Sequence, residues 1–75
     1  MPATEINVSY RSGSAAKGYR VMLSMHGGGV TDTVRTDGSG RAIVQHSSSG
    51  TADIFVDGNR VARGVRVPGR FAFTV

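Results

Sequence analysis

Apolar and polar residues alternate along most of the chain with a period of two. Tyr19, Val21 and Leu23, for example, share one side of a segment whose other side is more polar. Successive side chains of a β-strand point to opposite faces, so this pattern is typical of strands with one buried face. We predict seven short strands, at residues 6–10, 19–25, 29–36, 42–44, 52–56, 61–67 and 71–75. No segment has the longer period of an amphipathic helix, and the predicted fold class is all-β.

Tight-turn residues separate these segments. Asp37-Gly38 and Asp57-Gly58 are typical of two-residue hairpins, because glycine adopts positive φ freely and aspartate tolerates it. Gly64 lies inside the sixth predicted strand and indicates a β-bulge there. Short strands at regular spacing with such turns predict a sandwich or a barrel.

The chain of 75 residues has room for one domain, which we expect to span residues 1–75. A domain of this size buries only about 60–65% of the surface that its unfolded chain exposes, so its core is thin. The sequence has no cysteine, and therefore neither disulfides nor a zinc–thiolate cluster can reinforce that core. Self-association can supply the stability that such a small core lacks, and we therefore expect a homo-oligomer.

The first residues carry neither the basic start nor the apolar run of a secretion signal. No stretch approaches the ~20 apolar residues of a membrane-spanning helix, so we expect no membrane span. A cytoplasmic protein is the expectation, although a domain cut from a longer secreted chain would have the same composition.

Three segments follow one another in an order that resembles a known family. They are Gly-Tyr-Arg-Val-Met-Leu at residues 18–23, Thr-Asp-Gly-Ser-Gly-Arg-Ala at 36–42, and Ser-Gly-Thr-Ala-Asp-Ile-Phe-Val-Asp-Gly at 49–58. This order resembles the transthyretin-like, carboxypeptidase-regulatory-like β-sandwiches, which include repeat domains of bacterial surface proteins. The resemblance runs from Tyr10 to Val75 and implies a seven-stranded antiparallel Greek-key β-sandwich, transthyretin-like or Ig-like.

The resemblance implies a structural or binding activity more than a catalytic one. Family members serve mostly as spacers, adhesion modules or accessory domains for binding and assembly. Some surface-protein members carry an isopeptide bond from a lysine in the first strand to Asn or Asp in the last. Here the only lysine, Lys17, lies in a glycine-flanked link, and residues 70–75 contain neither Asn nor Asp. The isopeptide bond is therefore not expected.

His26 and His46 are the only histidines, and each ends a predicted strand. A metal site needs three or four converging ligands, and the sequence offers only Asp32 in addition. The histidines together with Ser47 could serve hydrolysis, but no Gly-x-Ser-x-Gly elbow leads into a helix. We interpret both histidines as solvated strand-end residues, and we expect no metal, no cofactor and no catalytic residue. The chain is predicted not to be an enzyme.

Charge is segregated along the chain. The formal net charge is +4, and no acidic residue occurs in residues 58–75. That stretch holds the candidate binding residues Arg60, Arg63, Arg66 and Arg70. Together they could form a basic face for a polyanion, such as single-stranded nucleic acid or an anionic polysaccharide. Arginines that keep edge strands from aggregating explain the same pattern.

Two main hypotheses about function follow from the sequence. The first is a non-catalytic β-sandwich that binds or assembles with a protein partner, including copies of itself. The second is polyanion binding through the four C-terminal arginines. Carbohydrate binding by an exposed tyrosine or phenylalanine is a third and lesser hypothesis.

Overall fold

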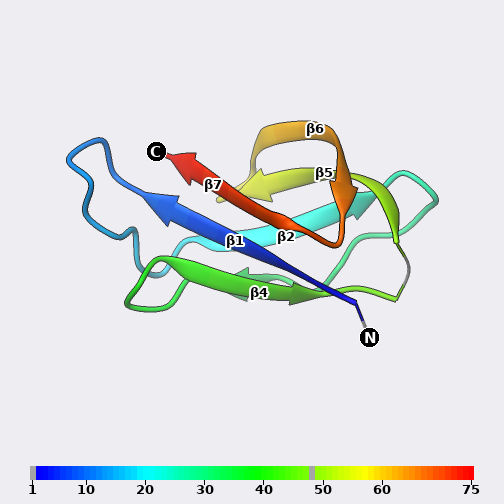
Figure 1. Cartoon of the computed structure of the whole chain (residues 1–75), viewed down its shortest axis with the longest axis horizontal. Coiled ribbons are helices and arrows are strands. Elements are labelled where there is room, and N and C mark those ends of the chain that lie inside the picture. Colours follow the sequence, from blue (N-terminus) through cyan, green and yellow to red (C-terminus); the bar gives the residue numbers. More distant parts are fainter. Residues whose placement is uncertain (1, 48) are drawn as a thin grey trace.

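Every strand of the structure comes from one of the alternating segments. The computed structural model describes residues 2–47 and 49–75, and this part of the chain contains strands and no helix (Figure 1). The strands are β1 (Ala3–Ser9), β2 (Arg20–Met25), β3 (Val34–Arg35), β4 (Arg41–Gln45), β5 (Gly50–Val56), β6 (Asn59–Val67) and β7 (Arg70–Thr74). The predicted all-β class is confirmed. Within the described residues no helix is long and apolar enough to cross a membrane.

The strands form two sheets. The three-stranded sheet has the order β4-β1-β7, and the four-stranded sheet has the order β3-β2-β5-β6. β1 pairs antiparallel with β4 but parallel with β7, which runs beside it in the same direction (Figure 1). The prediction that all strands pair antiparallel was therefore wrong for β7, because the alternation of apolar residues locates a strand but not the direction of its neighbour. All pairs in the four-stranded sheet are antiparallel.

The apolar faces of the two sheets meet in one core. In the three-stranded sheet the inward residues include Ile6 and Val8, and in the four-stranded sheet they include Leu23 and Ile54, all at most 2% exposed. Among residues 2–47 and 49–75 the buried apolar residues are Ile6, Val8, Ala16, Val21, Leu23, Ala42, Val44, Ala52, Ile54, Val56 and Val67. Each strand supplies this core with every second residue, because its side chains alternate between the two faces of the sheet. Two sheets sharing one core is the arrangement of a β-sandwich.

The third strand is shorter than predicted. Of residues 29–36, only Val34 and Arg35 pair as a strand, with β2. Val30 forms an isolated bridge with Ser24, and the intervening residues make no ladder. Thr31 explains part of this, because its hydroxyl accepts the backbone N–H of Leu23 at 2.9 Å where a ladder carbonyl would otherwise lie.

The turn at Asp37-Gly38 is not a hairpin, and that prediction was wrong. β3 before it belongs to the four-stranded sheet and β4 after it to the three-stranded sheet, so the turn carries the chain between sheets. The Asp37 carboxylate accepts the backbone N–H groups of Ser39 at 2.8 Å and Arg41 at 3.0 Å. These two hydrogen bonds, that from Arg41 first, lower the pKa of Asp37 below its ordinary value.

The residue before this turn fixes it to the rest of the four-stranded sheet. Thr36 is 4% exposed. Its hydroxyl donates to the Ala16 carbonyl at 2.6 Å and accepts the Tyr19 backbone N–H at 2.9 Å. A buried hydroxyl with both a donor and an acceptor partner costs little to bury, and here it joins the link before β2 to the crossing.

The Asp57-Gly58 turn, in contrast, is the hairpin that the sequence predicts. Val56 pairs with Asn59, and both turn residues have positive φ, 54° for Asp57 and 86° for Gly58. Positive φ at both central residues matches the twist of the flanking strands. The predicted bulge is also confirmed, since the β5–β6 register shifts on both sides of Ile54 and Gly64 has a φ of 64°.

We expect Gly40→Ala to destabilise the domain by about 2 kcal/mol or more. Gly40 has a φ of 75°, and a Cβ there would clash with the backbone carbonyl of Val8, which cannot move without disturbing β1. Gly38→Ala is the matched control, because a Cβ at Gly38 meets nothing within 4 Å. Urea unfolding measures both free energies. Equal midpoints for the two variants would show that the crossing does not constrain the fold.

Candidate functional site

The outer face of the four-stranded sheet gathers most of the chain's net charge. We call it the basic face. Its residues alternate with the buried Val21, Leu23, Ile54 and Val56, and so point away from the core. They are Arg20, Met22, Ser24, Arg35, Thr51, Asp53, Phe55, Asp57, Arg60 and Arg66, with Arg63 at the rim in the β6 bulge. Five arginines and two aspartates give it a net charge of +3, out of +4 for the whole chain.

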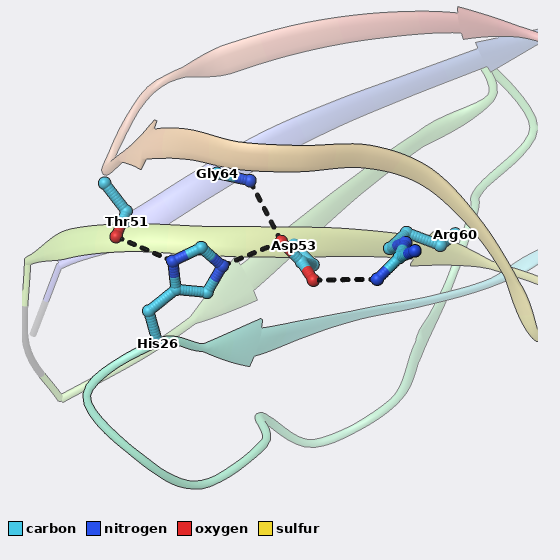
Figure 2. A network of polar contacts seen from close by, with 5 residues as sticks. All are labelled: His26, Thr51, Asp53, Arg60 and Gly64. Atoms are coloured by element: carbon cyan, nitrogen blue, oxygen red, sulfur yellow. Dashed lines mark hydrogen bonds and ion pairs between the residues drawn. The ribbon is translucent and has the colours of Figure 1, made fainter.

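Asp53 is the centre of a polar network on this face (Figure 2). Its Oδ1 accepts a hydrogen bond from the backbone N–H of Gly64 at 2.9 Å and lies 2.8 Å from Nε2 of His26. Its Oδ2 lies 3.5 Å from a guanidinium nitrogen of Arg60. The Asp53 side chain is only 15% exposed, so these contacts are partly screened from water.

The network explains why the bulge forms where it does. The extra residues in β6 break the regular β5–β6 ladder, and the Gly64 N–H loses its ladder acceptor. The Asp53 carboxylate supplies a substitute acceptor for that N–H. The hydrogen bond with His26, followed by that from Gly64, lowers the pKa of Asp53 below its ordinary value of 3.8.

His26 connects the ends of β2 and β5. Figure 2 shows its imidazole between Thr51 and Asp53, with Nδ1 3.0 Å from the Thr51 hydroxyl. Its backbone N–H also donates to the Thr51 carbonyl at 3.0 Å. Both ring nitrogens therefore have protein partners, and the imidazole serves to tie two strand ends together. The Thr51 hydroxyl, the His26 imidazole and the Asp53 carboxylate lie in the order found in the catalytic triads of hydrolases. Here, however, the carboxylate also holds the bulge through the Gly64 N–H.

Sequence reasoning missed this network because it considered His26 with Asp32 and Ser47. The signal lay in Thr51 and Asp53, two polar residues at alternate positions of a strand whose other face is apolar. Such residues share the outer face of a sheet, where a neighbouring strand can bring a partner.

The four candidate arginines do not lie together. Arg60, Arg63 and Arg66 lie on β6, but Arg70 lies on β7 in the other sheet. Arg70 is 78% exposed and pairs with Glu5, its Nε lying 3.2 Å from the carboxylate. Arg70 is therefore not part of the basic face.

Two of the remaining arginines have no acidic partner. Neither Arg63 nor Arg66 forms an ion pair with any residue in ranges 2–47 and 49–75, and both are exposed. Arg66 also lines a hollow of about 420 Å³ at the ends of β5 and β6, beside Thr51. Their charges are thus available to a ligand.

Strand pairing adds two arginines that the sequence did not single out. Arg20 of β2 lies directly opposite Arg35 of β3. Like charges at such a position repel, and only Arg20 has an acidic neighbour, Asp57 at 3.3 Å. Arg35 instead donates to the Gly18 carbonyl at 3.2 Å.

His46 is not the solvated residue that the sequence suggested. It is 4% exposed, and its Nε2 lies 2.9 Å from the hydroxyl of Thr4, which is itself fully buried. The pairing of β4 with β1 brings these two polar side chains into contact. His26 and His46 thus have different partners, and in the described part of the chain no three His, Cys, Asp or Glu side chains converge on a metal-sized site.

No protein-family model matches the chain, and no curated protein matches it either. The likeness to transthyretin-like sandwiches therefore rests on the short motifs at residues 18–23, 36–42 and 49–58. The function has to be argued from the basic face itself.

We expect Asp53→Asn to lower the melting temperature near neutral pH, and the deficit to shrink in acid. A carboxylate whose folded-state pKa is lowered stabilises the fold above its unfolded value of 3.8, and this contribution is lost as the pH falls through the folded value. Melting curves from about pH 6 down to about pH 2 follow the difference between variant and wild type. Asp32→Asn is the control, because Asp32 forms no ion pair among the described residues. A deficit that is constant with pH would contradict the network.

Proposed function

We propose that the chain is a non-catalytic binding module that holds single-stranded nucleic acid on its basic face. The observation that carries this proposal is that five arginines and Phe55 share the outer face of one sheet. Proteins that bind single strands without sequence preference combine a positively charged track for the phosphates with an aromatic platform for the bases.

The arginines supply the track. Arg60, Arg63 and Arg66 follow one another along β6, and Arg20 and Arg35 lie across the sheet from them. The four strands span about 14 Å, since neighbouring strands lie about 4.8 Å apart. A phosphate backbone laid over this width can contact arginines at both edges. Guanidinium groups suit this task because they bind phosphate through two parallel hydrogen bonds.

The repulsion between Arg20 and Arg35 supports an anionic ligand. Two cations held directly opposite each other cost stability in the free protein. A bound phosphate removes this repulsion. The repulsion energy that destabilises the free protein therefore adds to the free energy of ligand binding. A purely structural role for the arginines offers no reason to place them as neighbours.

Phe55 supplies the platform. It lies in the middle of the basic face, opposite Met22 of β2 and Arg60 of β6. Its side chain faces away from the core, whereas the side chains of Phe71 and Phe73 pack against the core. It is half-buried among its neighbours, so it is held rigidly while part of it remains open to a base. A hollow of about 140 Å³ on the same sheet is lined by Arg20, Met22, Thr33 and Gly58.

The relation to the transthyretin-like sandwiches, with their seven-stranded Greek-key topology, is part of the same proposal. The order of the three motifs and the two-sheet architecture support it. In that family the sandwich carries binding and assembly functions, which agrees with a module that works through a surface rather than a pocket.

Arg63→Ala combined with Arg66→Ala should weaken binding of an oligothymidylate by about 25-fold at 0.1 M salt. Each phosphate contact to a single strand contributes about 0.7 to the slope of log affinity against log salt, so two lost contacts reduce the slope by about 1.4. Fluorescence anisotropy at several salt concentrations measures both quantities.

The charge-matched control removes Arg11 and Lys17, which lie in the link before β2 and outside the basic face. This control should keep most of the affinity. Equal losses in the two double variants, or binding that is indifferent to salt, would contradict the proposal.

Phe55→Leu should lower affinity for oligothymidylate by about fivefold or more while leaving affinity for inorganic polyphosphate unchanged. Stacking on an aromatic ring contributes about 1–3 kcal/mol per base, and leucine keeps the apolar volume without the ring. The same anisotropy assay, with polyphosphate as competitor, gives both affinities. Equal losses for both ligands, or tighter binding of heparin than of oligothymidylate, would identify the ligand as a polyanion without bases.

A further inference from the structure

The two sheets have four edges; two of them are protected against further strand pairing, and a third is partly occupied by the chain itself. β3 has only two residues, too few to nucleate a ladder. β6 carries two register shifts, and such bulges twist an edge away from an incoming strand. These two strands are the edges of the four-stranded sheet.

The β4 edge of the three-stranded sheet is partly occupied by the crossing turn. The Asp37 backbone N–H donates to the Arg41 carbonyl at 2.9 Å, and the Asp37 carboxylate accepts the Arg41 N–H at 3.0 Å. Both backbone groups at the start of β4 are thereby satisfied within the chain.

The β7 edge has no such protection. The Glu5 N–H donates to the Gly69 carbonyl at 2.9 Å, and the Val75 N–H donates to the Ser9 carbonyl at 2.8 Å. In a parallel ladder the residues of one strand that bond to a given neighbour alternate, so Phe71 and Phe73 also bond to β1. The backbone groups left at the open edge are those of Arg70, Ala72 and Thr74.

Arg70 is the one charged residue of β7, and it is paired with Glu5 of the same sheet. The strand contains no proline, no lysine and no bulge, which are the usual devices at an exposed edge. Phe71 and Phe73 lie on its core side but are only partly buried, because no strand covers them beyond β7. A further strand at this edge would complete their burial.

We propose that β7 pairs with β7 of a second copy of the chain, antiparallel and about a twofold axis through Ala72. The three open residues then form three hydrogen-bonded pairs, Ala72 with Ala72 and Arg70 with Thr74 twice. The result is a continuous six-stranded sheet with the order β4-β1-β7-β7-β1-β4.

β7 is complementary to a second copy of itself in the antiparallel orientation. For this reason we assign its open edge to β7 of a second chain. Antiparallel pairing about Ala72 places Arg70 opposite Thr74, so no two charges of the same sign meet. It places Phe71 opposite Phe73 on the core side, at the closer type of pair, and aromatic cross-strand pairs stabilise sheets. Ala72, the smallest side chain of the strand, lies on the axis.

This interface does not depend on the basic face. β7 lies in the three-stranded sheet, and the basic face is the outer side of the four-stranded sheet. A twofold axis perpendicular to the joined sheet keeps both four-stranded sheets on the same side. The two basic faces would then lie next to each other, and a longer nucleic acid could span them.

Sedimentation equilibrium over a range of protein concentrations tests the proposal. The wild-type chain should have twice the chain mass of 7.8 kDa. Ala72→Pro should have the mass of one chain, because proline removes an N–H from the open edge and none from the ladder with β1. Ala72→Thr keeps the N–H and should remain a dimer.

Cross-linking provides a test that does not require the proline variant to fold. In a hydrogen-bonded antiparallel pair the two Cα atoms lie about 5.5 Å apart, within reach of a disulfide. Ala72→Cys should therefore form a covalent dimer on mild oxidation, and Ile43→Cys, on the outer face of β4, should not. A wild-type chain that is monomeric up to about 1 mM overturns the proposal, and so does equal cross-linking of both cysteine variants.

Discussion

The crossing of the chain between the two sheets at residues 36–40 is the constraint on which the rest of the structure depends. Thr36 ties the crossing to the link before β2 in the four-stranded sheet, and Asp37 ties it to the start of β4 in the three-stranded sheet. Gly40 then lies directly against the Val8 backbone of β1. The core is thin and buries little apolar area, so apolar packing alone specifies the position of one sheet against the other only weakly. These local contacts therefore fix how the two apolar faces meet.

Once the sheets are joined this way, their outer faces differ in charge and in use. On the three-stranded sheet Glu5 lies near both Arg41 and Arg70 and compensates half of their combined charge. On the four-stranded sheet Asp53 and Asp57 offset two of the five arginine charges, and the face keeps a net charge of +3. The bulge that protects the β6 edge also holds Asp53 in place, through the hydrogen bond from the Gly64 N–H.

The sequence was sufficient for the parts of the fold that depend on neighbouring residues. A period of two located all the strands, and the local conformations required at Asp57, Gly58 and Gly64 predicted the hairpin and the bulge. Periodicity tells which face a residue occupies but not which strand lies beside it. The parallel pairing of β1 with β7 joins segments far apart in the sequence. The pairing of β2 with β3 is not indicated by any Asp-Gly turn motif between them. For that reason the crossing was mistaken for a hairpin, Arg35 was missed, and Arg70 was grouped with arginines of the other sheet.

We propose that the basic face binds single-stranded nucleic acid. Backbone amide chemical shifts, followed by NMR during titration with an oligothymidylate, test it residue by residue. We expect the shift changes to concentrate on β2, β5 and β6. The Gly64 amide should be among the most affected, because its acceptor, Asp53, lies within the basic face. Shifts confined to the three-stranded sheet, or no shifts at low salt, would contradict it.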